Sequence, residues 1–371
     1  MYPVTSRREL KESLQAWTSD SYEEVKEEQR LEEGQTYLKS YLVESDREDF
    51  SQNFVDQEDL NIQVQPTQDE GFLHLKARGF SSEGVTDLYL DVLDDRFWVI
   101  HSVGPRDATD TIVDKLIFPR FTKLDYPWLP NKMLEDIGRQ PGGIFRRFSL
   151  KFQDEFSKEN GEMPDVGGLS MQLWGETAWK VLKTLRDNNE LRQSTPLSTV
   201  GIKKELDDET VIDDITYYSK FTARGDSVDG HFQQVQNLKN TYSELLHRIE
   251  DDHSIKHGSK GSGGTVSGSP LLLVFNREIE ELEEFMDALF SSKKPFRLWG
   301  VRNQLEKDYY RVSAVDLHTG DKLNLEICPE WARIYLPENS CGNVILRMYT
   351  NIQHYFDSQA ELEEENGGTI I

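Results

Sequence analysis

Hydrophobic positions recur with helical spacing in the first part of the chain, up to residue 42, and a polar stretch follows over residues 44–59. Ser6 and Glu9 have the spacing of a capping box, and apolar residues follow at intervals of three and four. A second box at Ser21 opens a segment that is polar nearly all round, and the helical spacing returns over residues 37–42. We therefore expect a short helical N-terminal arm, whose polar helix either faces solvent or orders against a partner.

From residue 60 the period changes from helical to alternating. Four short runs of apolar residues, separated by turn-forming residues, predict four strands. The runs are residues 62–64, 72–75, 88–92 and 97–100. Because connections this short cannot hold a crossover, we expect an antiparallel meander, followed by a helix over residues 107–118.

Strands and helices continue to the end of the chain. The next predicted elements are a strand over 169–174, a helix over 178–185, strands over 198–206 and 211–223, and a long helix from Asp226 to residue 254. After residue 270 the pattern predicts a strand over 271–275, a helix over 279–289, strands over 296–302, 309–317, 322–328, 332–336 and 344–349, and a short helix over 349–356.

Residues 255–270, IKHGSKGSGGTVSGSP, separate the two parts. Gly and Ser without large apolar residues can bury little, so a flexible linker is favoured over a long surface loop within one domain. The predicted fold class is α+β, with two modules of antiparallel sheet and packed helices joined by this Gly/Ser linker. The expected divisions are a helical N-terminal arm (1–58), an α+β domain (59–254), the linker (255–270), a smaller α+β domain (271–358) and a disordered acidic tail (359–371).

Composition describes a globular chain with a heavily charged surface. Of its 371 residues 36% are hydrophobic and 29% charged, and the net charge is −25. That charge argues against a protein whose whole surface binds nucleic acid or an anionic membrane, and fits either solubility or a high-salt cytoplasm. Cys328 and Cys341 are too few for a disulfide scaffold, and no apolar run approaches a membrane span. We expect a reduced, cytoplasmic protein without membrane contact.

Residues 116–152 differ from this acidic background. They hold seven basic residues against three acidic ones, a local charge of +4, interleaved with aromatic residues. Cations beside aromatic rings suit a phosphate backbone with stacked bases. The candidate nucleic-acid or anion contacts are Arg139, Arg146, Arg147 and Lys151, with Trp128 or Phe145 as the stacking surface. The alternative is that the aromatic rings belong to the core and the cations are solvated rim residues.

A second candidate site lies on the hairpin that spans residues 87–101. Carboxylates and a histidine can hold Mg²⁺ or Mn²⁺ for phosphodiester hydrolysis, and Asp91, Asp95 and His101 lie close enough along this hairpin to be considered. Aspartates near hairpin turns are also common solvated residues. No nucleophile, zinc or dinucleotide motif is present, so the sequence predicts no cofactor and no resident metal.

These observations favour a non-enzymatic cytoplasmic interaction subunit of a larger assembly, with a protein partner and a nucleic-acid or nucleotide contact through residues 116–152. A regulatory or genome-defence setting is one hypothesis for it. The competing class is a metal-dependent phosphodiesterase or nuclease that uses Asp91, Asp95 and His101. A third class is a structural protein that binds its partner through the polar helix over residues 21–33.

Overall fold

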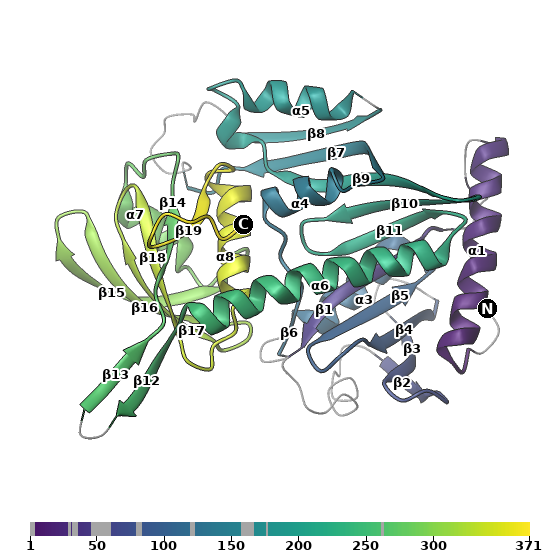
Figure 1. Ribbon diagram of the computed structural model, residues 1–371, viewed down its shortest axis with the longest axis horizontal. Helices are drawn as coiled ribbons and strands as arrows, with labels where there is room; N and C mark the ends of the chain where they lie inside the picture. Colours follow the sequence, from purple (N-terminus) through teal and green to yellow (C-terminus); the bar gives the residue numbers. More distant parts are fainter. Residues whose placement is uncertain are drawn as a thin grey trace. The chain divides into compact units, whose positions relative to one another are not determined.

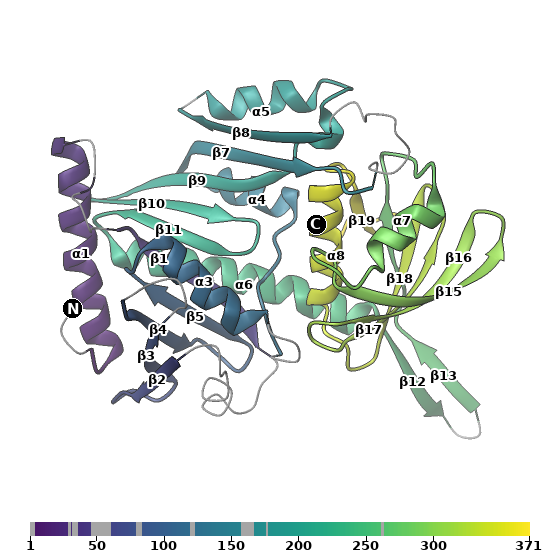
Figure 2. The same ribbon diagram turned by 180° about the vertical axis from the view of Figure 1, so that it is seen from behind.

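The computed structural model describes residues 4–28, 31, 36–45, 61–78, 84–118, 123–156, 167–175, 177–260 and 263–371. Within them the α+β class is confirmed, because helices accompany large antiparallel sheets (Figures 1 and 2). The chain divides into two compact units, and both are discontinuous in sequence. Unit 1 comprises residues 1–127, 138–145 and 201–240, and unit 2 comprises residues 128–137, 146–200 and 241–371.

The predicted meander forms one side of the unit 1 sheet. Its strands are β2 (Asn61–Pro66), β3 (Phe72–Arg78), β4 (Thr86–Val92) and β5 (Phe97–Ser102), each antiparallel to the next. The sheet continues through β1 (Leu38–Ser45), β11 (Lys220–Gly225) and β10 (Glu209–Thr216), and the short β6 (Leu124–Asp125) also pairs with β1. Strand β1 therefore lies in the middle of the sheet.

Among the described residues of unit 1, three helices accompany this sheet. They are α1 (Arg7–Glu28), α3 (Arg106–Ile117) and the first part of α6 (Val228–Asp252). Leu10 and Leu14 of α1 are buried in one core cluster with Leu38 of β1 and Phe72 of β3. Apolar residues at i and i+4 lie on one helix face, so the spacing seen in the sequence is the face that packs.

Unit 2 contains a strand pair with a helix alongside. Strand β7 (Gly143–Gln153) pairs antiparallel with β8 (Gly168–Trp174), and α5 (Ala178–Arg186) runs along β8 in both views (Figures 1 and 2). The 3₁₀ turn η1 (Arg192–Ser194), strand β9 (Leu197–Leu206) and the preceding helix α4 (Asn131–Gly138) complete this part, with β7 and β9 each contributing residues to both units.

The rest of unit 2 is built on a second sheet, which is antiparallel except that β12 pairs in parallel with β18. Its strand order is β13 (Gly263–Ser267), β12 (Ser254–Lys260), β18 (Trp331–Pro337), β17 (Lys322–Ile327), β16 (Tyr309–Asp316) and β15 (Leu298–Glu306). Strand β14 (Leu271–Val274) pairs with β18 on one side and with β19 (Glu361–Glu364) on the other. Helices α7 (Leu282–Leu289) and α8 (Asn343–Tyr355) belong to the same unit.

Two apolar runs were assigned to the wrong element. The helix expected over residues 37–42 is strand β1, and the strand expected over 344–349 is the start of helix α8. Every residue of β1 is buried, so the alternation that identifies a half-exposed strand is lost. Nearly all of α8 is buried too, which removes the polar face that identifies an amphipathic helix.

The linker and the tail are ordered elements of unit 2. Residues 255–270 were predicted to be flexible, but the described residues form the hairpin of β12 and β13. Backbone hydrogen bonds stabilise it where side chains bury little. The tail predicted to be disordered forms β19, in which Leu362 is fully buried. Residues 46–60 and 157–166 lie outside the described residues. None of the helices in the described part is long and apolar enough to cross a membrane.

Candidate functional site

The β7–β8 pair places a cation against an exposed indole. Arg147 lies directly opposite Trp174 in the strand register. The guanidinium carbon of Arg147 is 5.5 Å from the centre of the Trp174 ring, and Trp174 is 55% exposed. A guanidinium at this distance from an aromatic face is held by the ring quadrupole. Arg147 Nη2 also lies 3.4 Å from Ser149 Oγ, so the side chain is guided along the strand.

Alternation along β7 divides its side chains between two faces. Phe148, Leu150 and Phe152 are buried on one face, while Arg147 and Lys151 lie on the other, where Lys151 is exposed. On β8 the partners on the second face are Trp174, Gln172 and Ser170, all exposed. We call Arg147, Lys151, Ser170, Gln172 and Trp174 the β7–β8 surface.

The other candidate residues in this region do not join that surface. Arg146 follows the period of two onto the face opposite Arg147, so the two arginines do not form one binding surface. Trp128 is only 7% exposed, and its backbone N–H donates to the Tyr242 hydroxyl at 3.0 Å, which removes it as a stacking surface. Phe145 is partly buried and belongs, with the exposed Arg139, to unit 1.

The partly buried Phe145 ring lies against the backbone of Gly138 in its own unit. A Cβ placed on Gly138 would lie 2.6 Å from the Phe145 ring, so the glycine is what admits the ring there. The expectation that aromatic residues of 116–152 are core residues is therefore met by Trp128, whereas Phe145 is only partly buried.

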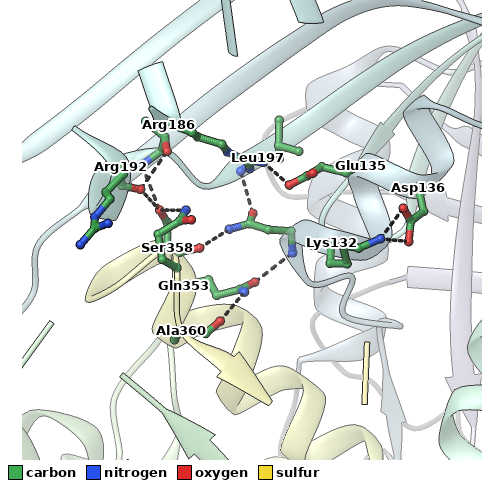
Figure 3. Close-up of polar contacts among 12 residues, drawn as sticks. Lys132, Glu135, Asp136, Arg186, Arg192, Leu197, Gln353, Ser358 and Ala360 are labelled. Atoms are coloured by element: carbon green, nitrogen blue, oxygen red, sulfur yellow. Dashed lines mark hydrogen bonds and ion pairs between the residues drawn. The ribbon is translucent and has the colours of Figure 1, made fainter. Parts of the chain in front are cut away.

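Charge separates the neighbourhood of the β7–β8 surface from the rest of the chain. Strands β7 and β8 and helix α5 together contain six basic residues and no acidic residue. The chain as a whole has 67 acidic and 42 basic residues. On α5, Lys180 and Lys183 are exposed, whereas Arg186 forms an ion pair with Glu135 of α4 (Figure 3). These three elements are thus a cationic layer in an acidic protein.

Buried hydrogen bonds fix the elements next to this layer. The Asn131 side chain accepts from the Leu197 N–H at 2.8 Å and donates to the Ser358 carbonyl at 2.8 Å, and the Asn131 N–H donates to Gln353 Oε1 at 2.9 Å (Figure 3). His354 Nδ1 donates to the Lys151 carbonyl oxygen at 3.0 Å, which ties β7 to α8. The scaffold beneath the β7–β8 surface is therefore held by several elements of unit 2.

The alternative metal site is not formed. Asp91 is ion-paired with Arg7 at 2.6 Å, Asp95 is exposed at the turn, and His101 is buried. No group of three or more His, Cys, Asp or Glu side chains that could hold a metal ion occurs among the described residues. The structure therefore does not bring Asp91, Asp95 and His101 together as a metal-binding group, since Asp91 contacts Arg7 and His101 contacts Ser40.

His101 instead belongs to a buried network in unit 1. Ser40 Oγ lies 2.7 Å from His101 Nδ1 and 2.7 Å from His231 Nε2, and His231 Nδ1 lies 2.7 Å from Asp213 Oδ1. The order serine, histidine, aspartate is that of a hydrolytic relay. However, all four side chains are at most 3% exposed, so a substrate has no access to the Ser40 hydroxyl. The network joins β1, β5, β10 and α6 and is structural.

Comparison with known proteins assigns the chain to a family. The sequence profile of the MJECL33-like proteins matches residues 1–371. The chain belongs to this family. The uncharacterized protein MJECL33 of Methanocaldococcus jannaschii is 29% identical over 405 residues, an alignment that covers 99% of this chain and 96% of that protein. The similarity thus extends over both units of the MJECL33-like chain.

Sequence reasoning missed Trp174 as a member of the site. The basic and aromatic window ended at residue 152, and Trp174 follows on the next strand. The alternation of the strand predicted over 169–174 could have identified it, because Ser170, Gln172 and Trp174 lie on one face of that strand. In this MJECL33-like protein the resulting surface offers two cations, two neutral hydrogen-bonding side chains and one stacking ring.

Proposed function

We propose that this MJECL33-like protein is a non-enzymatic binding subunit that contacts single-stranded nucleic acid through the β7–β8 surface. The observation that carries the proposal is the half-exposed Trp174 under the Arg147 guanidinium, within a layer that has no acidic residue. An anionic ligand would meet attraction here and repulsion over most of the remaining surface.

The chemistry of the β7–β8 surface fits a phosphate chain with unpaired bases. A base stacked on an aromatic side chain contributes about 1–3 kcal/mol of binding free energy, whatever the base. Arg147 and Lys151 are four residues apart on one strand, which corresponds to about 13 Å and suits separate phosphates. Ser170 and Gln172 supply neutral hydrogen-bonding groups between them.

Single strands fit better than duplexes because of the indole. Stacking on Trp174 requires a base that is not already stacked within a helix. A free nucleotide shares the same phosphate and base chemistry, and it would use one cation and the indole. A ligand that spans both cations should therefore bind more tightly than a mononucleotide.

The test is fluorescence anisotropy with labelled single-stranded DNA and RNA oligonucleotides, the matching duplex and a mononucleotide. Trp174→Ala should weaken single-strand binding by about 5- to 150-fold, which corresponds to the loss of about 1–3 kcal/mol of base stacking. Arg147→Glu should also weaken binding and reduce its salt dependence. Val266→Ala is the control for loss of an exposed apolar side chain, since Val266 is 66% exposed on β13, elsewhere in unit 2. Lys322→Glu, at an exposed lysine, is the control for charge.

Two results would refute the proposal. One is the absence of single-strand binding by the wild-type protein at low salt. The other is binding that Trp174→Ala and Arg147→Glu leave unchanged, or weaken no more than the two control variants do. Tighter binding of the mononucleotide than of the oligonucleotide would reassign the surface to a nucleotide.

We also propose that this subunit acts in the cytoplasm. Cys328 and Cys341 are free thiols, and Cys328 is buried. Free thiols persist where the cell keeps them reduced. Localisation of the tagged protein in its host, together with thiol titration of the purified protein, tests this part separately from ligand binding.

A further inference from the structure

Strand β15 forms an open edge of the second sheet in unit 2. It stands at the end of the strand order, and in the part of the chain that the structure describes no strand lies on its outer side. From Trp299 to Glu306 every side chain position except Gly300 is exposed. A free edge presents a row of backbone N–H and C=O groups that can pair with another strand.

The edge of β15 is also unusually apolar. Trp299 is 50% exposed, Val301 58% and Leu305 39%, and the period of two places Trp299 and Val301 on the same face of the strand. Natural edges are commonly protected by charge, proline or a bulge. Here a register shift between Gln304 and Glu306 ends the regular pairing, but residues 298–304 before it are regular.

Charge on the edge itself does not oppose a second copy of the chain as its partner. Two molecules of net charge −25 repel each other, so a contact between them needs a segment free of acidic residues. Residues 298–304 carry a single charge, that of Arg302, which forms an ion pair with Asp287 of α7. The segment is therefore effectively neutral.

The sequence of the edge is complementary to itself. An antiparallel pair with its two-fold axis at Val301 places the two Val301 side chains opposite each other and Trp299 opposite Asn303 of the other copy. Arg302 then faces Gly300 of the other copy, which leaves space for its ion pair with Asp287. An axis at Arg302 would oppose two guanidinium groups, and an axis at Asn303 would bring the register shift into the pairing.

We propose that the protein forms a two-fold symmetric dimer by antiparallel pairing of β15 with β15 of a second copy, centred on Val301. The pairing extends the sheet of unit 2 across the axis. It covers the exposed Trp299 and Val301 side chains and gives hydrogen-bond partners to the outer backbone groups of the strand.

Sedimentation velocity over a concentration series tests the dimer. Val301→Lys places two ammonium groups opposite each other across the axis, so the dimer dissociation constant should rise at least about tenfold. Val266→Lys is the matched control, because Val266 is 66% exposed on β13, at the other end of the same sheet, and this variant should dimerise as the wild type does.

Cross-linking tests the register. Under mild oxidation Val301→Cys should form a disulfide-linked dimer, because the axis brings the two introduced thiols together. Wild type, with its native Cys328 and Cys341, and Val266→Cys should not cross-link. A wild-type protein that stays monomeric up to sub-millimolar concentration overturns the proposal. So does a dimer that survives Val301→Lys unchanged, or one that Val301→Cys fails to cross-link.

Discussion

His101, a buried histidine of unit 1, predicts a loss of stability in mildly acidic solution. Burial, and to a smaller extent the neighbouring His231, lowers the pKa of His101 to about 3, against 6.5 for the exposed side chain. The unfolded chain therefore takes up a proton at this residue as the pH falls below 6.5, whereas the native protein does not. Stability is fully present above pH 6.5 and is lost progressively down to about pH 3.

The magnitude follows from the two pKa values. At pH 5 the unfolded His101 is mostly protonated and the native one is not, which costs about 2 kcal/mol of unfolding free energy relative to pH 7. Burial also lowers the pKa of His354 in unit 2 to about 4, and the same reasoning gives about 2 kcal/mol there. Carboxylates whose native pKa is lowered, such as Asp316, change stability only at more acidic pH.

Hydrogen exchange measures the contribution of His101 separately from that of His354. The amides of β1 and β5 report the opening of unit 1, and their protection at pH 7 and pH 5 can be compared after correction for the intrinsic rate. His101→Gln removes the titrating group, so the variant should lose about 2 kcal/mol less than wild type between the two pH values. His257→Gln, at an exposed histidine, is the control. An unchanged pH dependence in His101→Gln would refute the reasoning.

Three further predictions concern the scaffold. Leu14→Ala, at a fully buried position of the α1 core cluster, should lower the free energy of unfolding by about 2–5 kcal/mol, measured by urea denaturation. A loss below about 1 kcal/mol would contradict the packing of α1 in that cluster. Asn131→Ala should lower the free energy of unfolding by about 1–3 kcal/mol for each of the two buried groups that lose their partner, the Leu197 N–H and the Ser358 carbonyl. The measurement is the denaturation midpoint, and an unchanged midpoint would contradict the hydrogen bonds of Asn131. Gly225→Ala should destabilise unit 1 in thermal melts, because φ is +106° and the new Cβ would lie 2.0 Å from the Thr210 carbonyl oxygen; an unchanged melting temperature would contradict that geometry.

Secondary structure was predictable where one face of an element meets solvent. The meander of unit 1 and helix α5 alternate or repeat clearly, and the structure confirms both. Strand β1 and helix α8 are buried almost all round, so their sequences lack a polar face to set the period. The β12–β13 hairpin was missed for another reason, because its ladder is made by backbone groups that composition does not report.

The candidate site was predictable in part. The cationic character of the region and the residues Arg147 and Lys151 came from the sequence, while Trp174 required the pairing of β7 with β8. Adjacent residues such as Arg146 and Arg147 look equivalent in a charge count, and only the strand geometry separates their faces. The Ser40, His101, Asp213 and His231 network joins positions up to 191 residues apart, which no local pattern can reveal.

The salt dependence of single-strand binding tests the central proposal most directly. The logarithm of the binding constant of wild type and of Arg147→Glu/Lys151→Glu is measured against the logarithm of the salt concentration. Each phosphate contact to a single strand contributes a slope of about 0.7, so the double variant should bind more weakly and with a slope shallower by about 1.4. Equal slopes and equal affinities for the two proteins would contradict phosphate binding by the β7–β8 surface.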